Sequence, residues 1–302
     1  MSEQKMNRLS RRAMLRYSAA GLAAVGGGSL LGACQTTDPN TGQPEGGGGG
    51  LQQRADSGQP IRLAIANEPP YTKLEADGTI TGAAPDIAKA VLKRMGIENV
   101  EPKQTGYDSM IPGLQANRWD IVTAGLFMNQ DRCAQVLYTT PDLVSTESYA
   151  VPPGNPQGLR TLDDLKNKDL QVAVLAGGYE GRTAKAMGVP DSKLPTYQQA
   201  PDALQAMEAG RVYGILLPTL TLESLKEQQG ANYEITPPIE QFPVTGSGHA
   251  FRKSDQTFFQ KYNEEMKAFK ETSEFEQIMN QWGFDAEASR KATKEELCKT
   301  ES

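Results

Sequence analysis

The chain has 302 residues, with 31 Lys plus Arg, 37 Asp plus Glu, one His and three Cys, and its net charge is -6. With 38% hydrophobic residues it can bury a sizeable core, and its length suits one large domain or two smaller ones. The acidic balance argues against a general nucleic-acid binder, because neutralising phosphates needs a basic face. His249 is the single histidine, so the sequence has almost no residues for a Ser-His-Asp triad or a His-rich zinc site.

The first 33 residues are polarised in the manner of an export signal. Five basic side chains and one acidic one precede a mildly apolar stretch rich in Gly and Ala that is too short to span a bilayer stably. The stretch around Arg11 and Arg12 resembles a twin-arginine export signal, and residues 31–34 resemble a bacterial lipobox ending at Cys34. We therefore expect residues 1–33 to be a signal peptide and Cys34 to be acylated. The alternative is an uncleaved anchor with an incidental cysteine.

A polar segment with five consecutive glycines follows the lipobox. Residues 34–58 contain too few apolar side chains to offset their ordering entropy, so we expect a flexible tether. A lipid on Cys34 would then hold the rest of the chain at the outer face of the cytoplasmic membrane, or in the periplasm. From Cys34 onward there are 26 basic and 36 acidic residues, which gives the mature chain a charge of -10.

The two remaining cysteines, Cys133 and Cys298, form an even pair in a chain expected to be exported. Such pairs usually form disulfides, and this one would fasten the C-terminal tail to the first third of the chain. Two buried free thiols are the alternative.

From residue 60 onward, short apolar runs alternate with amphipathic segments, which predicts an α/β architecture. The expected strands are 61–66, 100–104, 119–124, 171–175 and 213–217. The expected helices are 85–95, 110–116, 161–168, 180–187, 203–209, one that follows Ser254 and 274–282.

Two extended segments, 148–156 and 242–251, are punctuated by Pro or Gly and lie on either side of the second series of elements. We interpret them as crossing strands between two lobes. Lobe 1 would comprise residues 59–150 and 246–302, and lobe 2 residues 151–245. A chain of this kind binds its ligand in the cleft between the lobes and closes about the crossings.

Several short motifs follow one another along residues 61–284. They are Asn67-Glu68-Pro69-Pro70-Tyr71, the Gly82–Ile87 segment, Asp120–Gly125 followed by Asp131-Arg132, Leu162–Leu165 and Gln281–Phe284. With this ordered set the sequence resembles type II periplasmic solute-binding proteins of ABC importers. Within that family it is most similar to ectoine- and hydroxyectoine-binding proteins, through residues 66–71, 111–114, 125–127 and 131–133. The resemblance implies a two-lobed fold with a sheet and flanking helices in each lobe.

The resemblance also implies a ligand site. Ectoine carries a carboxylate and a ring amidinium with a delocalised positive charge. Arg132 would hold the carboxylate in two hydrogen bonds, Glu68 would accept amidinium N–H groups, and an aromatic cage would face the cation. The cage positions are Tyr71, Tyr107 and Phe127. Weaker candidates for ligand contact are Gly125, Gly178 and Tyr179.

Each of these residues also has an ordinary structural interpretation. Arg132 could pair with a surface carboxylate, Glu68 could be a solvated turn residue, and the aromatic residues could be rim or core side chains. We expect His249 to be structural, and Trp119 and Trp282 to lie in the core.

One departure from the family bears on the ligand. Amino-acid binders of this family usually place an acid after a Gly-Arg-Val turn, where it pairs with the ligand's ammonium group. Here Tyr213 and Gly214 follow that turn, so the acid is missing. An ammonium group would then be poorly paired in a closed cleft, which favours ectoine, hydroxyectoine or a betaine.

We therefore expect a monomeric, non-enzymatic receptor for a small zwitterion. It would present its ligand to the membrane-embedded permease subunits of an ABC importer, and it would need no cofactor, metal or nucleic acid. A receptor for glycine betaine or a polar amino acid is the alternative of the same class. An enzyme on this fold, such as a dehydratase, is an alternative of another class. The absence of a histidine from the expected cleft loops of this sequence argues against it. A sensor ectodomain would need a transmembrane segment, and none follows.

Overall fold

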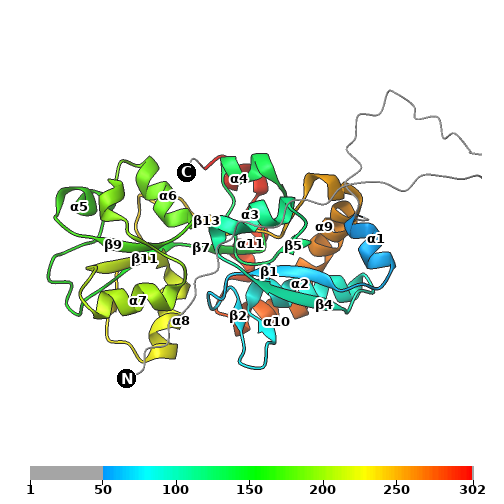
Figure 1. Ribbon diagram of the computed structural model, residues 1–302, viewed down its shortest axis with the longest axis horizontal. Coiled ribbons are helices and arrows are strands. Elements are labelled where there is room, and N and C mark those ends of the chain that lie inside the picture. Colours follow the sequence, from blue (N-terminus) through cyan, green and yellow to red (C-terminus); the bar gives the residue numbers. More distant parts are fainter. Residues whose placement is uncertain (1–49, 301–302) are drawn as a thin grey trace, which may run out of the picture. The chain divides into compact units, whose positions relative to one another are not determined.

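The computed structural model describes residues 50–300, so the expected signal peptide, Cys34 and most of the expected tether lie outside the described residues. Two five-stranded sheets form its framework (Figure 1). The first has the order β4-β1-β5-β14-β6, with β1 parallel to β4 and β5, and β14 antiparallel to β5 and β6. Its strands are β1 (Ile61–Ile65), β4 (Val100–Gln104), β5 (Ile121–Val122), β6 (Leu137–Tyr138) and β14 (Ala250–Phe251).

The second sheet has the order β10-β9-β11-β8-β12. Here β9 is parallel to β10 and β11, and β8 is antiparallel to β11 and β12. Its strands are β8 (Glu147–Val151), β9 (Val172–Leu175), β10 (Thr196–Tyr197), β11 (Gly214–Pro218) and β12 (Glu234–Ile235). The chain passes between the sheets through an antiparallel pair, β7 (Leu143–Ser145) with β13 (Thr245–Ser247), and the strands β2 (Lys73–Leu74) and β3 (Ile80–Thr81) form a short hairpin.

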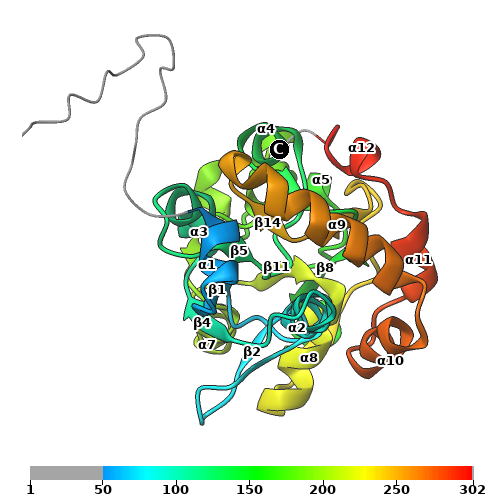
Figure 2. The same ribbon diagram turned by 90° about the vertical axis from the view of Figure 1, so that its right-hand side faces the viewer.

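Helices cover both sheets. Those that accompany the first sheet are α1 (Leu51–Asp56), α2 (Ala83–Arg94), α3 (Tyr107–Gln115), α4 (Gln130–Gln135), α9 (Gln256–Lys270), α10 (Ser273–Gln281), α11 (Ala286–Lys291) and α12 (Lys294–Leu297), with the 3-10 turn η2 (Lys253–Asp255). Those that accompany the second are α5 (Leu162–Asn167), α6 (Tyr179–Ala186), α7 (Ala200–Glu208) and α8 (Thr219–Gln229), with η1 (Asp191–Lys193). We call these two groups, each with its sheet, the first-sheet body and the second-sheet body. Figure 2 shows α9 to α12 following one another in orange and red.

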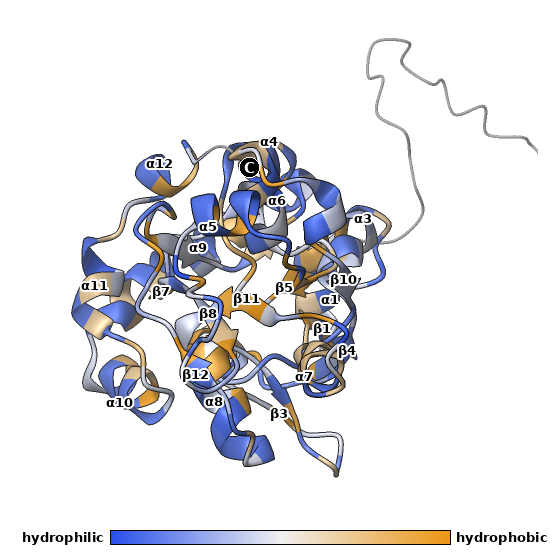
Figure 3. Ribbon diagram, turned by 90° about the vertical axis from the view of Figure 1, so that its left-hand side faces the viewer, coloured by the Kyte–Doolittle hydropathy of each residue, from blue (hydrophilic) through white to orange (hydrophobic). Residues whose placement is uncertain are grey.

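The strands are apolar because both faces of each sheet are covered. In β1, Leu63 packs into one core cluster and Ala64 into another; in β11, Leu216 and Leu217 separate in the same way. This is the period of two expected for a strand, and burial on both faces gives a continuous apolar run rather than an alternating one. In Figure 3 the ribbons of β5 and β11 are correspondingly orange, while α8 is largely blue.

The predicted α/β class and the order of its elements are confirmed, with shifts at several ends. The strand expected at 119–124 is paired only over Ile121–Val122, and α3 begins at Tyr107 rather than at residue 110. The segment expected at 148–156 to cross between lobes instead starts with β8, a strand of the second sheet, because the crossing strand β7 lies slightly earlier. Its partner β13 lies within the other expected crossing, 242–251. The residue boundaries given for the two lobes stay a prediction.

The predicted C-terminal boundary of the tether, residue 58, is wrong. Residues 51–56 form α1, because the glycine run stops at Gly50 and Leu51 is the first apolar side chain that can pack; it is 1% exposed. Its N–H donates to Asp255 Oδ1 over 3.4 Å.

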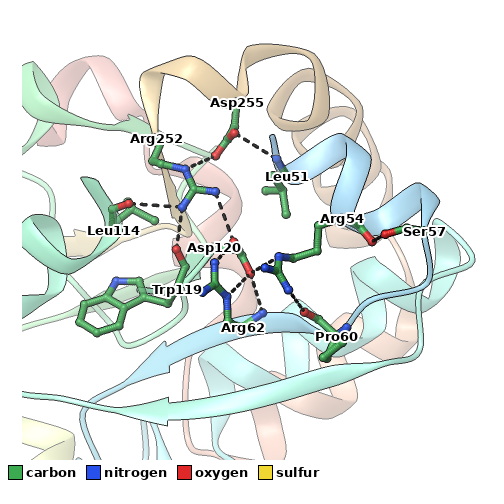
Figure 4. Close-up of polar contacts among 10 residues, drawn as sticks. All are labelled: Leu51, Arg54, Ser57, Pro60, Arg62, Leu114, Trp119, Asp120, Arg252 and Asp255. Atoms are coloured by element: carbon green, nitrogen blue, oxygen red, sulfur yellow. Dashed lines mark hydrogen bonds and ion pairs between the residues drawn. The ribbon is translucent and has the colours of Figure 1, made fainter. Parts of the chain in front are cut away.

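An ion-pair network behind β1 fastens this helix (Figure 4). Asp120 accepts Arg62 Nη2 at 2.8 Å and Arg252 Nη2 at 3.3 Å, and Arg54 Nε lies 3.5 Å away. Burial would raise the pKa of Asp120, but the hydrogen bonds from Arg62 outweigh it and lower that pKa. The network holds the start of the segment that leads through β5 to Gly125 and Phe127.

Candidate functional site

A cavity that the surrounding side chains nearly fill lies between residues of the two bodies. All eight residues that we expected to contact a ligand line it, and two further residues join them. The lining residues are Glu68, Tyr71, Tyr107, Gly125, Phe127, Arg132, Gly178, Tyr179, Glu180 and Pro218. The first six come from the first-sheet body and the last four from the second-sheet body. The sequence motifs thus converge in space, although 150 positions separate Glu68 from Pro218 in the sequence.

Arg132 is a buried cation without an anionic partner among residues 50–300. Asn129 caps α4 by accepting the Arg132 backbone N–H at 2.8 Å, and the side chain is only 4% exposed. Its Nη1 donates to Phe127 O at 2.7 Å, and its Nη2 donates to Gly177 O at 2.8 Å. Burial lowers the pKa of Arg132. Since a guanidinium has five N–H donors, Arg132 keeps donors for a ligand carboxylate, the partner that would offset its burial.

Aromatic rings line the same cavity as this cation. The rings of Tyr71 and Phe127 meet edge to face with their centroids 5.7 Å apart, and Phe127 and Tyr179 do so at 5.8 Å. Gly125 makes room for Tyr71: a Cβ there would lie 2.4 Å from Tyr71 Cδ1, and its φ of +66° also favours glycine. The faces of such rings attract a weakly hydrated cation, whereas their edges do not.

Glu68 places its carboxyl group at the same cavity. Two hydrogen bonds between Glu68 and Thr72 close the turn after β1. They fix the backbone of Glu68, from which its side chain extends. Tyr107 Oη lies 2.7 Å from Glu68 Oε2, and Thr221 Oγ1 donates to Glu68 Oε1 at 2.9 Å. Burial raises the pKa of Glu68, and these two hydroxyl contacts oppose the rise. Tyr107 Oη also lies 2.9 Å from Ala124 O, so its single hydrogen serves two acceptors.

The second-sheet body contributes backbone groups as well as the side chains of Tyr179 and Glu180. Gly177 O accepts from Arg132, and a Cβ on Gly177 would lie 2.4 Å from the backbone nitrogen of Asp108 in α3. Only a glycine lets this loop approach the other body so closely. Gly178 is the N-cap of α6, so the helix begins at the cavity with Tyr179 and Glu180 in its first turn.

Glu180 is the functional candidate that sequence reasoning missed. It lines the cavity, and burial, followed by the nearby charge of Glu68, raises the pKa of Glu180 to about 8. Burial likewise raises the pKa of its buried neighbour Glu147 well above the ordinary range. The acid that amino-acid binders place after the Gly-Arg-Val turn is absent, since position 213 is a tyrosine. However, α6 brings another acid to the cavity, so an ammonium group would not lack a partner there. The place of Glu180 in the first turn of a helix that begins after two glycines was the available signal.

The remaining sequence predictions concern residues that do not line the cavity. Cys133 and Cys298 are joined in a disulfide, as expected. His249 is buried, with Nδ1 2.7 Å from Tyr262 Oη and Nε2 3.1 Å from Asp142 Oδ2, which agrees with a structural role. Trp119 is buried in the core, while Trp282 is only partly buried. Among residues 50–300 no helix combines the length and apolar character needed to cross a bilayer.

Comparison with known proteins gives a consistent result. Residues 61–286 match the bacterial extracellular solute-binding proteins of family 3. A probable amino-acid ABC transporter periplasmic-binding protein, y4tE of Sinorhizobium fredii strain NBRC 101917 / NGR234, is 31% identical over 249 residues, which is 79% of this chain and 82% of that protein.

Among solved structures, EhuB in complex with hydroxyectoine is 38% identical with a TM-score of 0.80, and the match covers 83% of this chain and 98% of that one. An ancestral arginine-binding protein bound to glutamine is 27% identical with a TM-score of 0.66, and the match covers 74% of this chain and 96% of that one. The family match spans most of the described residues and includes every residue that lines the cavity. The chain therefore belongs to family 3 of the bacterial extracellular solute-binding proteins.

Proposed function

We propose that this chain is the solute receptor of an ABC importer and that it binds ectoine or hydroxyectoine in the cavity. The observation that carries the proposal is Arg132, a buried guanidinium without an acidic partner among residues 50–300, held beside aromatic rings and a carboxyl group. A zwitterion with a carboxylate and a delocalised cation complements all three features. The likeness to EhuB, solved with hydroxyectoine, supports the same ligand class.

In the proposed complex, Arg132 binds the ligand carboxylate through the N–H groups that its backbone acceptors leave over. Tyr71, Tyr107 and Phe127 face the ring cation, each well-placed ring contributing about 0.5–2 kcal/mol, and Glu68 accepts N–H groups from the ligand. Because Arg132 and Glu68 already bond to the second-sheet body through Gly177 and Thr221, a ligand that contacts both side chains favours the closed arrangement. Membrane permease subunits would receive the ligand when the bodies separate.

A receptor for a polar amino acid is the second candidate, and Glu180 is the observation that favours it. An α-ammonium group in this cavity would have Glu180 as well as Glu68 as a partner. Binding proteins for amino acids are also among the relatives of the chain. Glycine betaine is a third ligand with a carboxylate and a weakly hydrated cation, but it has no N–H group for Glu68 to accept.

Calorimetry separates these ligands. The purified chain, with Cys34→Ser to prevent acylation, is titrated with ectoine, hydroxyectoine, glycine betaine and a panel of amino acids. We expect ectoine or hydroxyectoine to bind with a Kd of about 1 μM or tighter, which corresponds to about -8 kcal/mol. Binding of an amino acid without any heat from ectoine would overturn the ligand assignment and leave the receptor role standing. Chemical turnover of any of these solutes would instead indicate an enzyme.

We also propose that the chain is exported by the twin-arginine route and anchored through Cys34, both of which rest on sequence motifs in residues 1–34. A labelled fatty acid should be incorporated into the wild-type chain and not into the Cys34→Ser variant. Export should fail when Arg11 and Arg12 are both replaced by Lys. Labelling that persists without Cys34 would overturn the anchor.

A further inference from the structure

The disulfide Cys133–Cys298 lies directly beside the proposed ligand-binding arginine. Arg132 and Cys133 are neighbours in α4, a helix of only six residues. Helices this short are not stable by themselves, so the position of α4 depends on what holds it from outside. One support is the Asn129 cap, whose Oδ1 accepts the Arg132 N–H and whose backbone oxygen accepts the Cys133 N–H. The other support is the C-terminal segment.

We call residues 292–300 the C-terminal brace. Besides the disulfide, it contacts α4 through Thr300 O, which accepts the Gln130 N–H at 3.1 Å. Leu297 of the brace is 7% exposed and packs on Gly246 of the crossing strand β13. A Cβ on Gly246 would lie 2.5 Å from Leu297 Cδ1 and 3.3 Å from Leu143 O, so glycine is required for this contact. Figure 2 shows α12 and α4 at the same end of the first-sheet body.

The same crossing strand holds the other end of the ligand-binding segment. Gly246 O accepts the Met128 N–H at 2.8 Å, and Phe127 forms a β-bridge with Ser247. A closed ring of contacts therefore runs from Cys133 through the brace to β13 and back to Met128. It encloses residues 127–133, which contain Phe127 and Arg132, and both of these side chains line the cavity.

We propose that the brace, locked by the Cys133–Cys298 disulfide, is a positioning element that fixes Arg132 and Phe127 in the geometry that binds the solute. The proposal rests on the ligand-binding roles proposed above. Without the lock, α4 and the preceding turn sample several arrangements, and a ligand binds only the competent fraction of them. Loss of the disulfide should therefore weaken ligand binding beyond what a general loss of stability would cause.

The test compares the Cys34→Ser chain with the same chain carrying Cys133→Ala and Cys298→Ala. We expect the Kd for ectoine to rise about tenfold, within the range for mutations that act through a coupled network. Amide hydrogen exchange should quicken at residues 128, 132 and 133 and stay unchanged in β9 and β11 of the second sheet. Reduction of the disulfide by a phosphine, which supplies the two electrons, should reproduce both effects and should not alter the double variant.

Two leucine variants separate positioning from stability. Leu297→Ala keeps the disulfide but removes the contact with Gly246, whereas Leu204→Ala empties a similar buried site in α7, far along the chain from α4 and outside the cavity lining. We expect only Leu297→Ala to weaken binding and to quicken exchange at residues 128–133. An unchanged Kd and unchanged exchange after loss of the disulfide would overturn the proposal. If Leu204→Ala weakens ligand binding as much as Leu297→Ala does, the brace contributes only to stability and the positioning role is overturned.

The outcome does not depend on ectoine being the ligand. If the unmodified chain binds an amino acid instead, the ligand assignment fails, and the same comparison of Kd values is made with that amino acid. If it binds none of the solutes, hydrogen exchange at residues 128–133 still decides whether the brace orders this segment. Should the double cysteine variant fail to fold, the reduced wild-type chain and Leu297→Ala provide the same readouts.

Discussion

The two sides of the cavity are built differently. The first-sheet body contributes six lining residues, among them the fixed cation Arg132, the acid Glu68 and three aromatic rings. The second-sheet body contributes a backbone carbonyl, a helix N-terminus, Thr221, and Glu180, whose pKa is raised to about 8 by burial and by Glu68. The first side thus has permanent side-chain chemistry for a zwitterion. The second side has groups that become partners only when the two bodies are together.

This difference indicates that the two sides of the cavity have different roles in ligand binding. Contacts within the first-sheet body hold Arg132 and Phe127 in place whatever the second body does, so the initial recognition of a ligand belongs there. The contacts from Arg132 to Gly177 and from Thr221 to Glu68 join the two bodies, so they form only when the bodies close on each other. Substitutions on the first side should therefore abolish binding, and those on the second side should adjust it.

The largest effect is expected from Arg132→Ala. Removing one partner of a buried charge pair costs about 2–5 kcal/mol, so the Kd for the proposed ligand should rise at least about thirtyfold. Calorimetry measures the change, with Arg118→Ala at an exposed position as the control. Arg132→Lys should also bind poorly, because an ammonium group cannot form the two parallel bonds. Wild-type affinity in Arg132→Ala would place the ligand carboxylate elsewhere and break the proposed contrast between the two sides.

The first side of the site was also the predictable one. Glu68, Tyr71 and Phe127 follow apolar runs that read clearly as strands, and parallel strands bring their carboxyl ends to one edge. Arg132 could be found for the same reason, since it lies shortly after β5. The α/β class followed from the same periodicity, because strands covered on both faces are continuous apolar runs.

The second side could not be predicted equally well. Gly177 acts through its carbonyl oxygen, which no side-chain pattern reveals, and Thr221 bonds to a residue 153 positions away. Glu180 is an ordinary first-turn acid in the sequence, and only its burial and the nearby charge of Glu68, which follow from the fold, raise its pKa. The short helices α4, α11 and α12 were missed because their positions depend on the disulfide and on packing rather than on their own periodicity.

A smaller effect is expected from Phe127→Leu, which keeps an apolar side chain but removes the ring. Loss of one cation-π contact should weaken binding of a cationic ring by about 0.5–2 kcal/mol, or up to about thirtyfold. Phe258→Leu, in the core between α9 and the first sheet, is the matched control for stability and should leave the Kd unchanged. If both variants bind like the wild type, the ring is packing rather than part of a cage.

Glu180 makes the second side sensitive to pH. With its pKa at about 8, Glu180 carries a proton in the free protein at pH 7, and a cationic group of the ligand beside it favours the carboxylate. Binding should then release a proton, so affinity should rise by about tenfold between pH 7 and pH 9 and level off above that. Calorimetry in two buffers with different ionisation enthalpies counts the protons. Glu180→Gln should reduce the proton release, and any release that remains would come from Glu147 or Glu68, whose pKa values burial also raises.

The same group affects stability with a definite sign. An unfolded glutamate has an ordinary pKa near 4.5, so between that pH and about 8 the folded chain holds a proton that the unfolded chain has lost. Ligand-free stability should therefore fall as pH rises through this window, and the fall should be shallower in Glu180→Gln. An affinity that decreases with pH would instead put the ligand carboxylate beside Glu180 and reverse the ligand's orientation.

The smallest effect is expected from Thr221→Val, which keeps the shape of the side chain and removes its hydrogen bond to Glu68. A net hydrogen-bond contribution of about 0.5–1.5 kcal/mol predicts a Kd about two- to tenfold higher, mainly through faster release, because the contact closes the cavity rather than recognising the ligand. Stopped-flow or surface-plasmon measurements would separate the rates, with Ser224→Ala as the control, because Ser224 lies on the same helix and bonds only to Gln228 of that helix. A slower association rate with unchanged release would place Thr221 in recognition and remove the distinction between the two sides.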